Sequence, residues 1–485
     1  MMKNNLKRIV ILFAVVLSLG ACTESFYDET PSDRILPDEH YNSMKEAEIS
    51  CKAPLAILRN VVPQMVFANE LLSDLTTVTE NAGLYWQDIN NHNLSQDNPH
   101  INPAVFYQVV INANESLLYI DSIANKDQDI TEIDIKIFKG NLIGIRSWAY
   151  FTLARLYGEV AFLKDNLPQL SADQLVYLPR LAIMDTLIND LLPYLDIDYE
   201  DIGNITMYNK ALIGEIYLEK QDYENAITYL RMAIEGFENL KTKYKLTKDF
   251  SKASWQNLFI NANSNTSEIM ITVPFSFVNN QSNPIELWYG YHFDYLAKPT
   301  PIIMNLFNQQ ADMKGNPGDV YRGITVSYDT INGVPFVNKY NLDPGLPLSS
   351  DIILYRSADI HLLLAEAMNR AGYSDIALAL LNEGYHEFTN WGSGLGVRGR
   401  AYLAPKTIPD GVNLVNYVED LIMEERALEL AFEGKRWTDL MRVARRRGNS
   451  WLADRVAAKF SNPDQANKIK EKLNNEQNWY LPFSK

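Results

Sequence analysis

Cysteine and positive charge are both scarce in this chain of 485 residues. The only cysteines are Cys22 and Cys51, too few for a disulfide framework or a cysteine-rich metal site. Lys and Arg number 44 against 60 Asp and Glu, which leaves a formal net charge of −16. Because so acidic a chain repels the phosphate backbone, we expect no nucleic-acid partner.

Glycine and proline are not abundant either, with 23 and 21 residues, so collagen-like and low-complexity chains are excluded. After the first 21 residues no run approaches the ~18 consecutive apolar residues that a membrane-spanning helix needs. What is present is 47% hydrophobic and 21% charged residues, typical of a globular protein with a large core.

The N-terminus predicts export and lipid attachment. Lys3, Lys7 and Arg8 precede an apolar run at residues 9–19, which is too short to span a bilayer and is typical of a signal peptide. The run ends in Leu-Gly-Ala-Cys22, similar to the lipobox at which bacterial lipoproteins are cleaved and acylated. The alternative is an ordinary signal peptide with an incidental cysteine.

The lipobox divides the chain into three parts. We expect a signal peptide at residues 1–21, a lipidated polar tether at 22–37 and a single body at 38–485. Removing the signal peptide takes away three positive charges and no negative ones, so the net charge becomes −19. Cys22 would carry the lipid, and Cys51 would remain without a disulfide partner in the chain.

The body is predicted to be mainly α-helical, with helices in pairs. Small and aromatic residues at residues 209–236 recur at the spacings of the 34-residue tetratricopeptide pattern, and residues 360–388 repeat them. Further helical regions lie near residues 140–160 and 417–447. The predicted fold is a tetratricopeptide-like helix-pair scaffold with large irregular loop insertions and a few short strands.

Two irregular insertions interrupt the helix pairs, at residues 77–103 and 237–350. They are rich in Asn, Asp, Pro and Tyr, and a strand is predicted near residues 268–274. Long irregular segments inside a compact domain usually carry function.

Short motifs that could indicate catalysis or cofactor binding do not occur in the structural context that such functions require. The G-x-G-x-x-G at residues 394–399 follows a predicted helix and not a strand, so it does not indicate a dinucleotide site. The six histidines include no H-x-x-x-H pair. Glu425 and Glu429 lie one helical turn apart, but Arg426, Lys435 and Arg436 nearby favour an ion-paired helix face. We therefore expect no catalytic residue, no metal ligand and no cofactor, and leave a structural calcium open.

Aromatic residues in the two insertions suggest carbohydrate binding. A sugar ring stacks its C–H face on an aromatic ring, while its hydroxyl groups bond to polar side chains. The candidate platforms are Trp86, Trp288, Tyr289 and Tyr291, and the candidate hydrogen-bond partners are Asp88, Asn90 and Asn91. For each aromatic taken singly, ordinary core packing is the alternative.

With the lipobox, the helix pairs and residues 424–442 (EERALELAFEGKRWTDLMR), the chain resembles the SusD/RagB family of Bacteroidetes outer-membrane nutrient-binding lipoproteins. Residues 355–367 and the terminal Trp-Tyr-Leu-Pro from Trp479 also look like the family. His361 is a departure, since family members more often have an apolar or aromatic residue there.

The resemblance implies a non-enzymatic protein at the cell outer membrane, lipid-anchored and facing outward. Such proteins capture glycans and deliver them to a SusC-like TonB-dependent transporter. No family ligand motif transfers residue by residue, so the candidate residues rest on composition and location. The alternatives are peptide or other nutrient binding for the same transporter type, a periplasmic-side scaffold for protein partners, and, least expected, a glycoside hydrolase.

Overall fold

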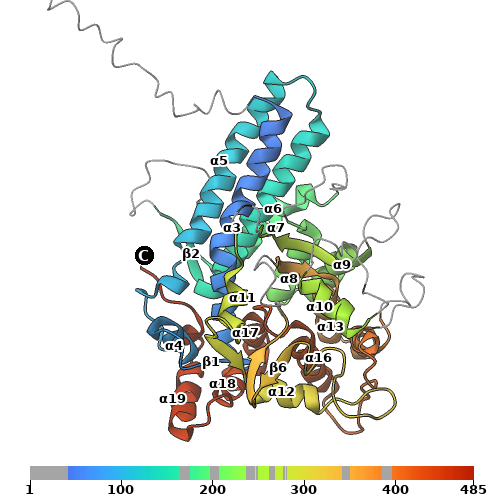
Figure 1. Ribbon diagram of the computed structural model, residues 1–485. Helices are drawn as coiled ribbons and strands as arrows, with labels where there is room; N and C mark the ends of the chain where they lie inside the picture. The colour runs from blue at the N-terminus through green and yellow to red at the C-terminus, as the bar shows by residue number, and fades with distance from the viewer. Residues whose placement is uncertain are drawn as a thin grey trace, which may run out of the picture.

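A computed structural model describes residues 42–163, 175–196, 207–235, 246, 250–260, 268–276, 279, 281–340, 350–384 and 396–484. The predicted signal peptide, Cys22 and the tether lie outside these residues, as do the first two residues of the glycine motif at 394–399. The fold is mainly helical, as predicted, with a few short strands (Figure 1). In the described part of the chain, no helix combines the length and apolarity that crossing a membrane requires.

The helices in the described residues, in chain order, are α3 (Met44–Leu72), α4 (Leu84–Asn90), α5 (Ala104–Lys126), α6 (Glu132–Tyr157), α7 (Arg180–Leu191), α8 (Asn209–Glu219), α9 (Tyr223–Glu235), α10 (Lys252–Ile260), α11 (Pro284–Tyr289), α12 (Pro301–Asn308), α13 (Ser357–Arg370), α14 (Ser374–Asn382), α15 (Val397–Arg400), α16 (Leu414–Leu430), α17 (Arg436–Arg447), α18 (Asn449–Ala457) and α19 (Pro463–Leu473). Short 3-10 turns are η2 (Pro99–Ile101), η4 (Leu192–Tyr194) and η8 (Glu476–Trp479).

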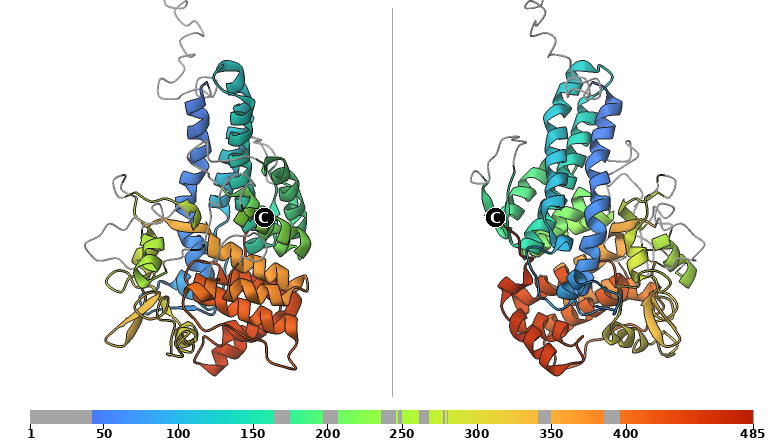
Figure 2. Two further views of the ribbon diagram at one scale, coloured as in Figure 1. Left: turned by 90° about the vertical axis from the view of Figure 1, so that its right-hand side faces the viewer. Right: turned by 60° about the vertical axis from the view of Figure 1, so that its left-hand side comes forward.

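Three long helices, α3, α5 and α6, pack together and project from the body as a stalk (Figure 2). The start of α6 is set by a capping box, in which Thr131 and Asp134 satisfy each other's backbone N–H groups. Its end is set by Gly158, whose φ of +80° is favourable only for glycine. The end of the stalk has its own small core, which includes Cys51, and burial raises the pKa of this free thiol to about 12.

The predicted helix pairs are present. Helix α8 packs on α9 and α13 packs on α14, with α13 also lying against α9. Gly214 of α8 faces Leu230 of α9 so closely that a Cβ atom would stand 2.8 Å from the leucine side chain. Gly372, at the turn between α13 and α14, has a φ of +96°. The small residues of the repeat pattern thus act in packing and turning.

The insertion at 237–350 is more ordered than expected. It contains the short helices α10, α11 and α12, and the predicted strand is β4 (Ile269–Val273), which pairs antiparallel with β8 (Ile352–Arg356). Strands β6 (Tyr328–Ile331) and β7 (Val334–Val337) form a hairpin. Two other antiparallel pairs are β1 (Thr76–Val78) with β5 (Ala297–Pro299), and β2 (Glu159–Ala161) with β3 (Tyr177–Pro179).

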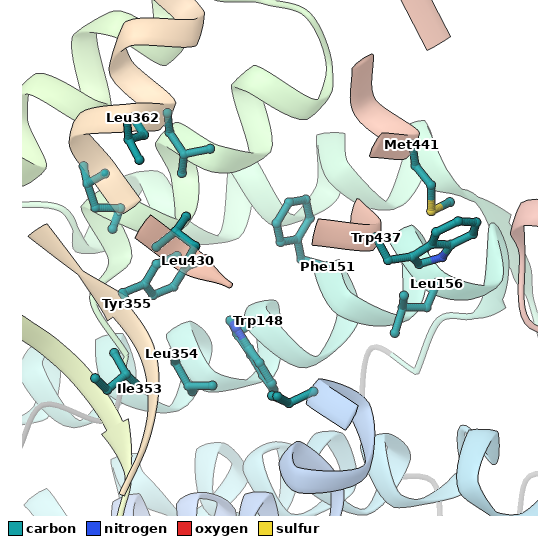
Figure 3. Packing of buried hydrophobic residues seen from close by; sticks show 14 of the residues in the cluster. Trp148, Phe151, Leu156, Ile353, Leu354, Tyr355, Leu362, Leu430, Trp437 and Met441 are labelled. Atoms are coloured by element: carbon teal, nitrogen blue, oxygen red, sulfur yellow. The ribbon is translucent and has the colours of Figure 1, made fainter. Parts of the chain in front are cut away.

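The large core lies where the stalk meets the helix pairs. Figure 3 shows Trp148 and Phe151 of α6 close to Trp437 of α17, while Tyr355 of β8 enters from another side. These rings are almost completely buried, so residues far apart in the sequence share one apolar interior.

Charged side chains are also buried in this interior, in a cluster around Glu429 of α16. Its carboxylate pairs with Arg322 and with Arg356, each at 2.7 Å, and with Arg400. Burial raises the pKa of Glu429, but the guanidinium groups of Arg400, Arg356 and Arg322 hold it well below its usual range. We call Glu429, Glu268, Glu425, Glu433, Arg322, Arg356 and Arg400 the ionic cluster.

The ion-paired role predicted for Glu425 and Glu429 is confirmed, but the partners predicted from sequence neighbours were wrong. Glu425 pairs with Arg322 and Arg398, both far from it in sequence. Arg426 and Lys435 instead pair with Asp359, and Arg436 pairs with Asp74. Helix neighbours point to different sides of α16, whereas the fold brings distant arginines to its buried side.

We predict that Glu429→Gln lowers the free energy of unfolding by about 3–5 kcal/mol, because it leaves three buried guanidinium groups with one carboxylate fewer. The matched control is Glu424→Gln on the same helix, whose partly exposed pair with Lys406 is worth about 1 kcal/mol or less. Urea unfolding of both variants measures the difference. Equal losses would contradict the structural role of the cluster.

Candidate functional site

The two insertions meet along a short β-ladder. Strand β1, at the start of the first insertion, pairs antiparallel with β5 of the second, so that Thr77 lies opposite Lys298. Beyond β1, the backbone N–H of Thr79 donates to Leu296 O at 2.9 Å, and the Asn81 side-chain amide donates to Asp294 O at 3.1 Å. Segments more than 200 residues apart thereby form one region, to which α4 and α11 contribute (Figure 1).

Three of the predicted aromatic residues gather around Phe67 of α3. Ring centroids of Trp86, Trp288 and Tyr289 lie 4.9, 5.0 and 5.1 Å from that of Phe67. The two tryptophans are 5.4 Å apart. Aromatic residues chosen from two separate segments are therefore in direct contact.

Burial divides this group into two kinds. Trp86 is 5% exposed and Tyr289 is 1% exposed, so neither ring offers a free face in this structure, and both help to form the core. Trp288 is partly buried and packs on the edge of that core. Trp86 and Tyr289 are therefore core residues in this structure, which was the alternative to a ligand platform. A role in ligand contact remains a prediction for Trp288.

His100 covers the outer face of Trp86. The two rings are parallel, with an interplanar angle of 7° and centroids 3.7 Å apart. Tyr85 packs edge-on against His100 at 6.3 Å and is 47% exposed. Burial lowers the pKa of His100, which favours the neutral imidazole. The rings that face solvent above Trp86 are thus those of Tyr85 and His100.

Tyr85 and His100 were not among the predicted site residues, although both lie in the predicted insertion. Within α4 the buried residues are Trp86, Ile89 and Asn90, which share one face of the helix. Tyr85 lies one helical turn before Ile89, at the edge of this face, so helical spacing alone does not predict that it is exposed. The position of His100 over Trp86 depends on the fold of the loop after α4 and has no signal in the sequence either.

The predicted polar partners behave differently from one another. The Asn90 side-chain amide donates to Asn91 Oδ1 at 3.1 Å, and Gln465 of α19 donates to the same oxygen at 3.0 Å. Through Asn91, the end of α4 is hydrogen-bonded to α19. Asp88 is partly exposed, and its carboxylate accepts a hydrogen bond from the Asn93 side-chain amide at 3.2 Å. Of the three, Asp88 keeps the most freedom to meet a ligand.

Tyr291 belongs to a second aromatic group beside the β6–β7 hairpin. Its ring lies 5.5 Å from Tyr295 and 5.7 Å from Phe336 of β7, and the Tyr295 hydroxyl donates to Pro335 O. Phe336 was not predicted from sequence. Phe293, in the same turn as Tyr291, is 36% exposed. We call Tyr85, His100, Trp288, Tyr291 and Phe293 the aromatic surface.

Metal binding finds no support here. The described residues contain no group of three His, Cys, Asp or Glu side chains arranged to hold an ion. The absence of cofactors and catalytic residues stays a prediction, and so does the ligand role of the aromatic surface.

Comparison with known proteins finds similar sequences in one family. The model of the SusD family matches residues 336–485. SusD-like proteins P38 and P2 of Formosa agariphila are 23% and 22% identical to the chain over 90% of its length, and the matches span 92% and 91% of theirs. Together these matches support a SusD/RagB family protein.

Solved structures of the SusD superfamily share the fold. A protein from Bacteroides vulgatus superposes with a TM-score of 0.73 at 18% identity, covering 91% of this chain and 96% of that one. A laminarin-binding SusD-like protein has a TM-score of 0.64 at 19% identity over 88% and 96%. NanU of B. fragilis has a TM-score of 0.66 at 19% identity over 88% and 93%. Both insertions that build the aromatic surface lie largely outside the residues that match the SusD family model.

The end of α3 and the turn before β1 are anchored to the start of α17 and to the segment just after α18. Glu70 accepts a hydrogen bond from the backbone N–H of Gly434 at 2.7 Å, and Arg436 forms two bonds of 2.8 Å to Asp74. Lys459 donates to the carbonyl of Leu71. Burial lowers the pKa of Lys459 to about 7. These bonds hold the start of β1, and with it α4, in place.

Helix α11 is anchored on the other side of the site. The Asn283 side chain donates to Ser350 O at 2.8 Å, and the backbone N–H of Ser350 donates to Glu286 at 3.0 Å. Ser350 lies just before β8, whose last residue is Arg356 of the ionic cluster. Both halves of the aromatic surface are therefore attached to the same buried framework.

We predict a pH-dependent effect of Glu70→Gln on stability. Burial raises the pKa of Glu70 from its ordinary value of 4.5 to about 7, so the folded protein holds a proton that the unfolded chain releases. Below pH ~4.5 the neutral carboxyl contributes fully to stability, and this contribution falls as pH rises to ~7, by on the order of 3 kcal/mol. Glutamine cannot ionise but keeps an acceptor for Gly434.

Urea unfolding of the wild type and of Glu70→Gln between pH 4.5 and 8 tests this prediction. Relative to the variant, the wild type should lose stability as pH rises through 7. A stability difference that does not change with pH would show that the Glu70 proton is not linked to folding.

Proposed function

We propose that this protein is an outward-facing outer-membrane lipoprotein that captures nutrient glycans, oligo- or polysaccharides, and delivers them to a SusC-like TonB-dependent transporter. Its role is binding without catalysis. In this proposal residues 1–21 are a signal peptide, Cys22 carries the lipid, residues 22–37 are the tether, and residues 38–485 form the single body.

The observation that carries glycan capture is the aromatic surface. It combines Tyr85, which is 47% exposed, and His100 from one insertion with partly exposed Trp288 and Tyr291 from the other. Flat rings of this kind match the apolar C–H faces of sugars. Asn81, Asp88 and Asp294 belong to the same two segments and offer groups that bond to hydroxyls.

The comparisons support the same proposal. The matches support a SusD/RagB family protein, and one structure of the same fold is described as a laminarin-binding protein. We expect weak binding to the isolated protein, because rings lying on an open surface leave much of a sugar solvated. Closure onto the transporter would then supply further contacts.

We predict that Tyr85→Ala combined with Tyr291→Ala weakens glycan binding by about tenfold, because two stacking rings at roughly 0.5–1.5 kcal/mol each are lost. The control is Tyr373→Ala, which removes a ring of similar exposure, 45%, from the turn between α13 and α14. Isothermal titration of the full-length lipoprotein in detergent against a glycan panel measures the change.

Two outcomes would count against glycan capture. The first is binding to a peptide panel and to no glycan, which would favour peptide uptake by the same transporter type. The second is an equal loss for the control variant, which would show that the aromatic surface is not the binding site. Release of sugars from polysaccharide by the purified protein would contradict the non-enzymatic role.

For localisation, we predict that Cys22→Ser moves the protein out of the membrane fraction, since the acyl chains that provide stable anchoring would be lost. Tagged wild-type protein should co-purify with a large TonB-dependent barrel protein from outer membranes. Full protection of the wild-type body from protease added to intact cells would contradict an outward-facing position and favour a periplasmic scaffold.

A further inference from the structure

The two segments that build the aromatic surface contain almost no positive charge. Residues 77–103 have no Lys or Arg, and residues 284–300 have only Lys298. The same segments contain five carboxylates, at Glu80, Asp88, Asp97, Glu286 and Asp294. All except Glu286 are exposed or partly exposed. The surface that a ligand would meet is therefore acidic.

Among the described residues, the cations of other elements that bond to the first insertion or to the turn before it are already engaged. Lys459 is buried and donates to the carbonyl of Leu71. Arg436 forms a two-bond pair with Asp74, and Lys472 donates to the carbonyl of His92. These groups hold the backbone of the first insertion in place.

Two of the nearby histidines supply no cation either. His92 is fully buried, and its Nε2 lies 3.0 Å from the carbonyl of Leu72. His100 is stacked flat on Trp86, half-buried, and its surroundings favour the neutral ring. At neutral pH, the rings that cover Trp86 are thus uncharged.

Sulfate esters and uronic acid carboxylates are recognised by charge-assisted hydrogen bonds from Arg or Lys, often with Arg in a two-bond geometry. Sugar hydroxyls, in contrast, donate readily to carboxylates such as those of Asp88 and Asp294. An anionic sugar brought to this surface would lose water of hydration, would find Lys298 as the only Lys or Arg in the two segments, and would face repulsion from Glu80 and Asp294.

From this charge distribution we propose that the site selects uncharged glycans and discriminates against sulfated or uronic-acid-rich ones. This inference rests on the proposed function, since it assigns a ligand class to the same aromatic surface. The evidence for this selectivity is the placement of charged side chains and not the aromatic rings themselves.

The experiment uses pairs of polymers with one backbone. Neutral glucan, mannan, xylan, galactan and fructan are each compared with their carboxymethylated derivatives by isothermal titration with the full-length lipoprotein at low salt. The expected result is that a neutral polymer binds and its derivative binds at least about tenfold more weakly, with the difference reduced at high salt.

A derivative that binds as tightly as its neutral parent, or that binds when no neutral polymer does, would overturn the selectivity while leaving glycan capture intact. Failure of every polymer to bind would overturn glycan capture itself, and the selectivity with it. The two failures are therefore distinguishable.

A charge reversal tests whether the site is responsible. Asp294→Lys places a cation beside Asn81 and should strengthen binding of the carboxymethylated derivative several-fold, about 3- to 10-fold, in a salt-dependent way. The control is Asp410→Lys in the exposed loop between α15 and α16, which makes the same change of net charge. Equal gains in the two variants would show that overall charge, and not this site, disfavours anionic glycans.

Discussion

The buried ionic cluster around Glu429 is the interaction on which the rest of the structure depends. Glu429 of α16 meets Arg322, Arg356 and Arg400, which come from three different parts of the chain. Burying so many ions is costly, and the cost is offset only when each charge meets its partners. The cluster therefore requires the second insertion, β8 and α15 to be in place together around α16, and it ties the insertion to the helix pairs.

From this cluster the structure extends to the aromatic surface by two routes. One runs from Arg356 along β8 to Ser350, which bonds to both Asn283 and Glu286 and so holds α11. The other runs through the residues just after α16, where Gly434 bonds to Glu70 and fixes the turn that leads to β1 and α4. Trp86 and Trp288 meet because both routes start from one framework. In the proposed function, rings held in this way would be pre-organised for the glycan.

Much of the scaffold was predictable because its signals are local. Tetratricopeptide spacing marked α8, α9, α13 and α14, and the strand near residues 268–274 is β4. Hydrophobic periodicity and small residues between paired helices are patterns of a few neighbouring residues, so they can be detected in the sequence. The short helices α11 and α12 were missed within the second insertion, since helices of so few residues have little periodic signal. The two insertions predicted to hold the site do meet in the fold, whereas Trp86 and Tyr289, chosen within them as ligand platforms, are buried; the ligand role of the others stays a prediction.

By itself the sequence determined the helical class, the paired helices, the acidic balance and the two aromatic segments, because composition and spacing express these directly. Only the tertiary structure decided that Trp86 and Tyr289 are buried while Tyr85 stays exposed, and that His100 covers the face of Trp86. It also decided which arginines neutralise Glu425 and Glu429. Exposure and ion pairing depend on which distant segments pack together, and that packing belongs to the whole fold and not to any local stretch of residues.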